Sequence, residues 1–412
     1  MFPPSGSLWK YSLIPQAVAN GLSSILVLFF LLSDLHGGLL DVGIVAGVSA
    51  LALIPSQMLW GWLIDGTGRC KPFLVLGFMG MGFSFISIPY VGSVSQLIAL
   101  VSLKSILFSA TLPARQLLTV ESEQREGWRR GLANMQFLSG LGETLGMGIG
   151  VATVTSMGFA QLFLMCGVLC MLSAMASGVL AREPGFMIQR KLVRLERSTS
   201  ALVAISNLVG YSGRPPQGHA SMRILGQLNP STKFLMVGIF AFSLGGATLF
   251  SPLPAYFLQI YSSSAVFLLF FGGSLAGTLC YPLVGRLALS AGKSLVLSSG
   301  ARMVVIPLLL LTALGAAPGL ALGAAILALL EALWTLFDIS SMFAFLETAL
   351  DGQAGFYGAL IGLGSAGGGF LGGFVSMQLG FASLFALCSI VCAGALVAFG
   401  LQFRSSLRLQ HE

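Results

Sequence analysis

The sequence predicts an all-α integral membrane protein with 12 transmembrane helices. Two observations carry this prediction: 56% of the 412 residues are hydrophobic, and only 8% are charged. A soluble domain carries roughly 25% charged residues, because water must solvate its surface. The mean hydropathy of +0.91 points the same way. Lipid must therefore cover most of this surface, which excludes a soluble enzyme, a disordered chain and a secreted disulfide scaffold.

Each predicted span is an apolar run between turn signals, about 20 residues long, which is the length that a helix needs to cross a bilayer. Alternating segments of about 10 residues, which a membrane barrel requires, do not occur. In chain order the spans cover 12–34, 41–63, 72–92, 96–118, 131–153, 158–181, 233–259, 264–284, 294–314, 319–346, 354–378 and 380–403.

The basic residues predict which side of the membrane each loop faces. If the N-terminus is cytoplasmic, the loops expected outside contain no Lys or Arg. Of the 21 basic residues, Lys104 and Arg302 fall within spans, and the others lie in loops, termini or helix ends expected inside. Because cytoplasmic loops carry an excess of Lys and Arg, we expect both termini in the cytoplasm. The basic residues behind the net charge of +7 are then expected to contact membrane lipids and not nucleic acid. We expect the protein to lie in the cytoplasmic membrane of a prokaryote.

The chain divides into two similar halves. We expect an N-terminal six-helix bundle over 1–181, a cytoplasmic central loop over 182–232 and a C-terminal six-helix bundle over 233–412. The segments 158–170 and 380–392, which open the sixth and twelfth spans, agree at 7 of 13 positions. Near-constant offsets along the chain indicate two six-helix pseudo-repeats. The fifth and eleventh spans also align, with Gly131, Gly140, Gly142 and Gly146 on Gly358, Gly367, Gly369 and Gly373.

The cysteines predict neither a metal site nor disulfides. Each of the two aligned segments contains a Cys-x-x-x-Cys pair, without a histidine or a third ligand nearby. We expect these pairs to face lipid as small apolar side chains. No G-x-x-x-x-G-K-[ST], H-E-x-x-H or intramembrane His-Asp set occurs. An enzyme, a metal and a cofactor are therefore not expected.

A loop between the second and third spans carries a family motif, Gly61-Trp62-Leu63-Ile64-Asp65-Gly66-Thr67-Gly68-Arg69-Cys70-Lys71-Pro72. It resembles the signature G-x-L-x-D-R-x-G-R-(R/K) of the major facilitator superfamily. Gly66 and Cys70 stand where that signature has basic residues, and a second-half copy over 285–293 has Leu289 where Asp65 stands. Together with the duplicated twelve-span pattern, the resemblance covers essentially the whole sequence.

The resemblance implies a secondary active transporter of a small solute that works by alternating access. The two halves of such a transporter rock about a site near the middle of the membrane. Asp65 and Arg69 would latch the cytoplasmic gate in the outward-open state, and Gly61 and Gly68 would permit the sharp turn. A basic loop that only sets topology is the alternative. A monomer is expected, and a membrane sensor that does not transport is the remote alternative for the whole chain.

Two further patterns resemble those of proton-coupled antiporters in the same family. Leu100 and Lys104 have the spacing of L-x-x-x-R-x-x-Q-G, with Lys for Arg, and Gly142 to Met147 matches G-x-x-x-G-P without the proline. Small-x-x-x-small spacing also serves plain helix packing. We expect proton-coupled efflux of an amphipathic compound, and proton-coupled uptake of a small polar metabolite stays open.

Ionisable side chains at membrane depth are costly and are therefore functional candidates. Glu331, Asp338 and Glu143 are the candidate proton carriers, with Glu331 first because the sequence offers it no fixed partner. Arg302 with Asp338, and Lys104 with Glu143, are candidate structural ion pairs. The offset of 227 residues also places Lys104 opposite Glu331 across a pseudo-twofold axis. Polar residues at helical spacing predict a substrate cavity lined by Gln16, Asn20, Lys104, Thr111 and Thr335.

Overall fold

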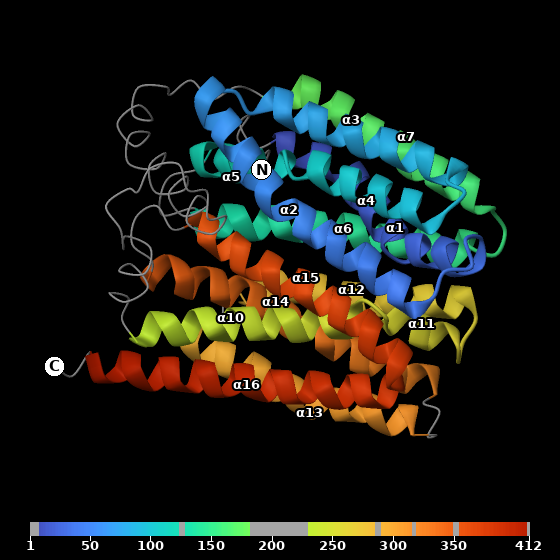
Figure 1. Cartoon of the computed structure of the whole chain (residues 1–412). Helices are drawn as coiled ribbons and strands as arrows, with labels where there is room; N and C mark the ends of the chain where they lie inside the picture. The colour runs from blue at the N-terminus through green and yellow to red at the C-terminus, as the bar shows by residue number, and fades with distance from the viewer. Residues whose placement is uncertain are drawn as a thin grey trace, which may run out of the picture.

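The computed structural model describes residues 8–122, 128–181, 230–284, 290–314, 319–348 and 354–409, and the regular elements in these ranges are helices. Helices of the first half lie in the upper part of Figure 1, and those of the second half lie in the lower part. The first half contains η1 (Leu8–Leu13), α1 (Ile14–Ser33), α2 (Leu39–Thr67), α3 (Lys71–Ser87), η2 (Ile88–Tyr90), α4 (Val94–Phe108), α5 (Thr111–Ser122), α6 (Trp128–Thr153) and α7 (Phe159–Leu180).

The second half has the same character, with long apolar helices joined by short connections. It contains α10 (Pro230–Phe250), α11 (Leu253–Leu258), α12 (Ser263–Val284), α13 (Ala291–Ala313), α14 (Leu320–Thr348), α15 (Ala354–Gln378) and α16 (Gly380–Leu409). The predicted central loop lies outside the described residues up to α10, which begins at Pro230 and not at the predicted residue 233.

Within the described residues, 11 helical segments are long and apolar enough to cross a membrane. They coincide with eleven of the twelve predicted spans. The fifth predicted span is helix α6, which does not meet the same measure of apolarity. Asn134, Gln136 and Glu143 lie in α6 and lower its hydropathy. The chain is therefore an all-helical, multi-pass membrane protein in which one predicted span is markedly more polar than the others.

The fourth and seventh predicted spans are each divided into two helices. Ser109 and Ala110 form a turn between α4 and α5. Pro113 lacks an N–H group, and its ring clashes with the carbonyl group four residues earlier, which is that of Ser109. The Ser109 Oγ lies 2.8 Å from the Ser56 Oγ, so the turn is fastened to α2. Pro252 and Pro254 interrupt the seventh span between α10 and α11 in the same way.

Helix packing in the second half repeats that in the first. Helix α1 packs on α6 and α7, α3 on α4 and α7, and α2 on α4. In the second half, α10 packs on α15 and α16, α13 on α14 and α16, and α12 on α14. The halves meet mainly through α2 with α15 and α6 with α12. These two helix pairs hold the halves together on either side of the interface.

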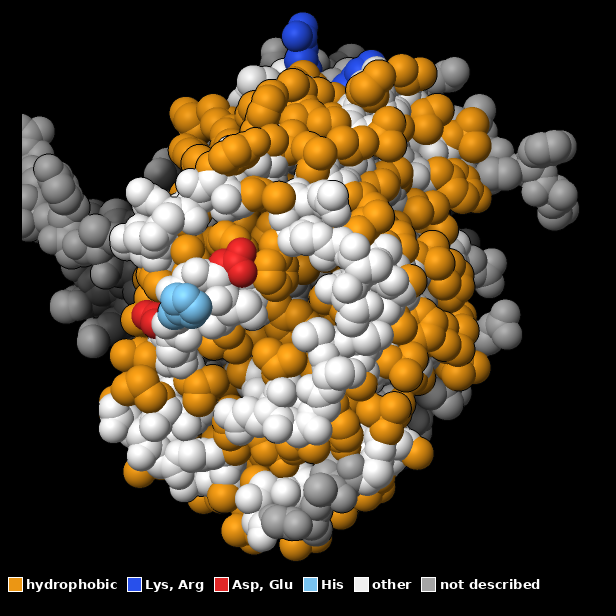
Figure 2. Space-filling model, turned by 90° about the vertical axis from the view of Figure 1, so that its right-hand side faces the viewer, with side chains coloured by type: hydrophobic (Ala, Val, Ile, Leu, Met, Phe, Trp, Pro, Cys, Tyr) orange, Lys and Arg blue, Asp and Glu red, His pale blue; other side chains and the backbone are white. Residues whose placement is uncertain are grey.

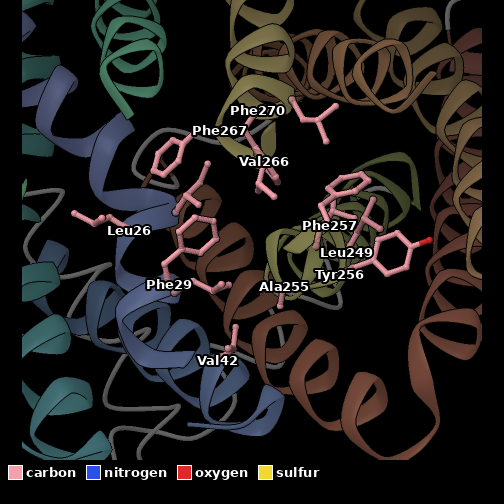
Figure 3. Packing of buried hydrophobic residues seen from close by; sticks show 14 of the residues in the cluster. Leu26, Phe29, Val42, Leu249, Ala255, Tyr256, Phe257, Val266, Phe267 and Phe270 are labelled. Carbon is pink, nitrogen blue, oxygen red and sulfur yellow. The ribbon is translucent and has the colours of Figure 1, made fainter. Parts of the chain in front are cut away.

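The backbones of the two halves touch near the start of α2. A Cβ atom on Gly43 would lie 2.6 Å from the Gly373 Cα, so α2 and α15 touch through their backbones. Phe29 of α1 and Phe267 of α12 meet edge to face, with ring centroids 5.7 Å apart. Figure 3 shows both rings in a hydrophobic cluster to which α1, α2, α11 and α12 contribute. The molecule is therefore closed between the halves at this end.

Figure 2 looks onto the end of the molecule that lies on the right in Figure 1. Hydrophobic and uncharged groups cover most of this face, acidic side chains and a histidine lie left of its centre, and Lys and Arg are seen only at its upper edge. The scarcity of basic groups on this face agrees with the loops that are expected outside.

Candidate functional site

Three carboxyl groups from the two halves lie in one neighbourhood. Glu143 of α6 comes from the first half, and Glu331 and Asp338 of α14 come from the second. Glu143 acts electrostatically on Glu331, and the phenol of Tyr281 in α12 lies within electrostatic range of all three carboxyl groups. All three side chains are half-buried. The predicted proton carriers are thus neighbours at the interface between the halves.

Glu143 is held from the first half. The Asn20 Nδ2 donates a hydrogen bond of 3.0 Å to the Glu143 Oε1. Gly21 permits this contact, because a Cβ atom there would overlap the backbone of Glu143 where α1 crosses α6. Arg115 of α5 lies in electrostatic range of Glu143, is only 8% exposed, and stacks 5.4 Å from the ring centroid of Phe108. Among the described residues, Glu143 thus has a hydrogen-bond donor in Asn20 and a cationic neighbour in Arg115.

Glu331 lies against α12 and faces the first half. Gly273 and Gly277 make room for it, because a Cβ atom on either would lie 3.3 Å from the Glu331 side chain. Arg302 of α13 is in electrostatic range of Glu331. No hydrogen bond to the Glu331 carboxyl group is found in the part of the chain that the structure describes. Its carboxyl oxygens therefore have a charged neighbour, Arg302, but no hydrogen-bond partner among the described residues.

Asp338 lies two helical turns further along α14 and has neutral polar neighbours. The Gln136 amide of α6 donates a hydrogen bond to its carboxyl group, so this contact also joins the halves. The Tyr357 hydroxyl lies 2.8 Å from the Ser341 Oγ and donates to the Asp338 backbone carbonyl at 3.4 Å. A polar path thus continues from Glu331 towards the end of α14.

Tyr281 has a hydrogen bond with Thr335 and can accept one from a protonated acid. The Thr335 Oγ1 donates its own hydrogen to the Gly277 carbonyl at 3.1 Å, so it can only accept from Tyr281. The phenol therefore gives its hydrogen to Thr335, and its oxygen lone pairs can still accept a hydrogen bond. Such an arrangement can hold a proton on one acid and pass it to another.

Lys104 does not belong to this site, which corrects two sequence-based expectations. Its Nζ lies 5.1 Å from the ring centroid of Phe85 in α3, and its titratable neighbours are Cys166 and Cys170 of α7. It therefore points into the N-terminal bundle. It neither pairs with Glu143 nor faces Glu331, because α4 turns this side of the helix towards α3.

Arg302 does not pair with Asp338 either. Its side chain is fully buried inside the C-terminal bundle, 4.6 Å from the ring centroid of Phe242 and 5.2 Å from that of Trp334. Its Nη2 donates to the Leu330 carbonyl at 3.4 Å. The carboxyl group that acts on it is that of Glu331. The expected partner is thus replaced by one two helical turns away on α14.

Of the predicted cavity residues, Asn20 and Thr335 lie at the carboxyl cluster. Gln16 is buried against α7, where its backbone N–H donates to the Ser173 Oγ at 2.7 Å. Thr111 is buried against α3, because a Cβ atom on Gly77 would collide with it, and its Oγ1 donates to the Phe108 carbonyl at 2.8 Å. Neither side chain has a described contact with the cluster.

Sequence reasoning placed Arg115 on the polar face of the fourth span with Lys104 and Thr111 but did not choose it as a site residue, and it missed Gln136 and Tyr281. Signals for the latter two were present. Gln136 lies seven residues before Glu143 on one face of α6, and Tyr281 continues a face of α12. That face begins with Ser274 and Thr278, whose hydroxyl oxygens lie 2.8 and 3.3 Å from the Thr144 Oγ1 of α6. Polar stripes on the fifth and eighth spans therefore mark this interface.

The motif loop turns as expected. Gly68 ends α2 in the left-handed conformation, with φ 69°, and its N–H donates to the Ile64 carbonyl at 2.8 Å. Arg69 is exposed, and a Cβ atom on Gly61 would meet no atom within 4 Å. Asp65 lies in the last turn of α2, and its side chain is outside the described part of the chain, as is residue range 285–289 of the second copy. The latch therefore stays a prediction.

The cysteines are free, but they do not face lipid as expected. Cys166 and Cys170 of α7 are buried inside the first bundle, and Cys388 and Cys392 of α16 are buried inside the second. The outer faces of α7 and α16 are formed instead by larger side chains, among them Met175 and Ile390. Both pairs thus lie on the inward faces of their helices.

The comparisons with known proteins agree with this architecture. The family model described as the Major Facilitator Superfamily matches residues 13–353, which is most of the chain. A comparison with curated proteins found no match. Members of the matched family are transporters and not enzymes. The match and the many apolar helices together show that this chain belongs to the major facilitator superfamily and is a secondary transporter.

Proposed function

We propose that this protein exports an amphipathic compound across the cytoplasmic membrane of a prokaryote in exchange for protons. The observation that carries the proposal is the neighbourhood of Glu143, from the first half, with Glu331 and Asp338, from the second. A proton bound between the halves changes its surroundings when the halves rock. Coupling needs a site of this kind, because the proton must be bound in one state and released in the other.

The pair of Glu143 and Glu331 supplies a physical reason for coupling. Two carboxylates of like charge repel strongly out of bulk water. A proton on either one relieves the repulsion while the halves are close, and that relief ends when the halves separate at the site. Tyr281 can hold the shared proton's hydrogen bond, because its own hydrogen is given to Thr335. The movement of the halves would thereby become a change in proton affinity.

The surroundings of the cluster support an amphipathic compound. Tyr281 and Tyr357 present aromatic rings with polar ends beside Asp338. Apolar pockets with a few polar groups are typical of small-molecule sites. A small polar metabolite taken up with protons would use the same acids, so the direction of proton movement distinguishes the two proposals.

The repeated helix packing supports the remaining architecture that we propose. In this proposal α6 is the fifth of 12 spans, the bundles 1–181 and 233–412 are pseudo-repeats, and the termini lie in the cytoplasm. Each half would then place its equivalent of α1 and α4 beside the central site, as alternating access by two rocking halves requires. A monomer is sufficient, because both halves belong to one chain.

The experiment has two steps. A screen of amphipathic compounds against the melting temperature of the purified protein identifies a ligand, because a ligand that binds the folded state stabilises it. Flux of that compound is then measured in proteoliposomes with an imposed pH difference, using an ionophore that removes the difference as the control. We expect the compound to accumulate on the side from which protons leave. Protons moving together with the compound would show uptake symport, and binding without flux would show a sensor.

A further inference from the structure

Each half of the molecule places a cation beside a pair of cysteines, and Lys104 is half-buried whereas Arg302 is fully buried. Lys104 lies over the ring of Phe85 and close to Cys166 and Cys170. In the second half, Arg302 lies over the ring of Phe242 and close to Cys388 and Cys392. The cysteine pairs occupy corresponding positions of the two halves, but the cations come from the fourth and the ninth predicted spans. The two environments differ in charge: among the described groups acting on these cations, a carboxyl group, Glu331, acts on Arg302 and none acts on Lys104.

The guanidinium of Arg302 is enclosed and incompletely bonded. The side chain is 0% exposed, and its Cζ lies 4.6 Å from the Phe242 ring centroid, 5.2 Å from that of Trp334 and 5.4 Å from that of Phe250. Aromatic faces attract a guanidinium, but they do not accept its hydrogen bonds as an oxygen does. Within the described residues, the Nε and Nη1 atoms have no hydrogen-bond partner. A buried charge of this kind needs a counter-charge nearby.

The fold makes a specific place for this side chain. A Cβ atom on Gly246 of α10 would lie 3.2 Å from the Arg302 Nη1 and 2.8 Å from the Trp334 ring. The Nη2 atom binds the carbonyl of Leu330, the residue that precedes Glu331 in α14. The guanidinium is thus fixed to the backbone turn that carries the carboxyl group of the site.

We propose that Arg302 is a positioning residue that stabilises the deprotonated, charged form of Glu331 relative to its protonated form. It does so from inside the C-terminal bundle, where neither the transported compound nor bulk water reaches it. The other titratable groups facing Glu331 are Glu143 of α6 and Tyr281 of α12, and Asp338 lies on the same helix. Glu143 is of like charge, so Arg302 is the group that stabilises the carboxylate. The inference rests on the proposed role of Glu331 as a proton carrier.

The test measures the protonation of Glu331 directly and needs no substrate. Dicyclohexylcarbodiimide is a hydrophobic reagent that reacts with protonated carboxyl groups, and peptide mass spectrometry gives the rate of its addition at Glu331. The rate is measured against pH on the full chain in lipid vesicles. Arg302→Met and Arg302→Gln remove the charge, and Arg302→Lys retains it. Lys104→Met removes the matched cation of the first half.

Without its counter-charge, Glu331 should stay protonated, because an unpaired carboxylate is unstable away from water. We expect modification of Glu331 at pH 8 to rise roughly tenfold in Arg302→Met and Arg302→Gln, which corresponds to one unit on the pH scale. In Arg302→Lys and Lys104→Met, the rate of Glu331 modification should stay within about twofold of the rate in the unmodified protein. Both variants keep a positive charge next to Glu331. Melting temperature and gel filtration establish that each variant is folded.

Three results would overturn the inference. They are an unchanged rate in a folded charge-free variant, an equal rise in Lys104→Met, and an equal rise in Arg302→Lys. The first would show that Arg302 only packs, and the others that the rise reports a loosened bundle. A failure of the proposed function would be seen in a different experiment, the transport assay, in which Glu331→Gln would still accumulate the compound under an imposed pH difference. The aromatic rings around Arg302 make Met the better tolerated replacement, and Gln provides the second charge-free variant if Met does not fold.

Discussion

Asp41 and Asp65 lie at the two ends of α2 and separate a structural role from a gating role. Asp41 accepts a hydrogen bond of 2.8 Å from the Gly38 N–H, which caps the first turn. Asp65 lies in the last turn, in the motif loop. Asp65→Asn should therefore reduce flux roughly tenfold without loss of folded protein, since a latch that biases two states by about 1.4 kcal/mol changes their ratio by that factor. Flux into vesicles, normalised to folded protein, measures this.

The matched control is Asp41→Asn, because asparagine can still cap the helix. It should leave flux within about twofold of the unmodified protein. Equal flux in Asp65→Asn and the unmodified protein would remove the latch from the account and leave the loop a purely topological role.

Chemical modification of the cysteines tests where they face. Cys166, Cys170, Cys388 and Cys392 are buried, and Cys280 is half-buried on α12. N-ethylmaleimide should modify Cys280 in the folded protein and spare those four until denaturant is added. Mass spectrometry after limited reaction gives the sites. Early modification of Cys166 or Cys388 would contradict their position inside the bundles.

At this scale the sequence predicts which carboxyl groups gather at the interface better than it predicts the partners of the cations. Glu143, Glu331 and Asp338 were identified because carboxyl groups at membrane depth are costly. The partners of Lys104 and Arg302 were wrong, because a sequence offset gives a residue's height along a helix but not the direction its side chain takes. A helix that is apolar on all faces offers no amphipathic pattern from which that direction could be read.

Helices α2 and α15 form a close-packed seam at one end of the molecule. Gly43 and Gly47 face Gly369 and Gly373, and a Cβ atom on Gly373 would lie 2.6 Å from the Gly43 Cα. Gly373→Leu therefore cannot form this closed contact without separating the helices. It should favour a conformation that is open at this end.

The accessibility of a cysteine between the halves measures this shift towards the open conformation. In a Ser274→Cys background with Cys280 replaced by serine, an impermeant maleimide added outside cells should react roughly tenfold faster when Gly373→Leu is present. Gly394→Leu on α16 is the control, because a Cβ atom there would meet nothing within 4 Å. Equal rates in the two leucine variants would show that the seam does not gate access.

Element boundaries followed local chemistry where the sequence made it visible. Hydropathy alone predicted a continuous fourth span, but Pro113 and the Ser109 contact with Ser56 divide it. Helix α6 was expected as an ordinary span, and its polar residues instead serve the interface with α12 and α14. The break between α4 and α5 and the polar residues of α6 both occur where the helix contacts another helix.

For the whole molecule, the orientation of the helices in the membrane is a direct prediction. Ser262 lies between α11 and α12, in a loop expected outside, and Thr67 lies in the motif loop expected inside. With Cys280 replaced by serine, an impermeant maleimide should label Ser262→Cys in intact cells. Thr67→Cys should react only after permeabilisation. The opposite pattern would invert the topology.

The fold class was predictable because the physics of a bilayer leaves few alternatives. Lipid requires each spanning segment to satisfy its own backbone hydrogen bonds, so long apolar runs can only be helices. The assembly of the halves was less predictable. Contacts such as Gly43 with Gly373 and Phe29 with Phe267 join residues far apart in the chain, and a single sequence does not state which helices meet.

The central claim is that Glu331 carries the coupled proton, and Glu331→Gln tests it most directly. Glutamine keeps the shape of the side chain and fixes it in a neutral form. In proteoliposomes with an imposed pH difference, the variant should lose accumulation of the compound against its gradient. Exchange at equal concentrations on both sides needs no net proton movement and should survive. Accumulation that persists in Glu331→Gln would contradict the account and direct attention to Asp338 or Glu143.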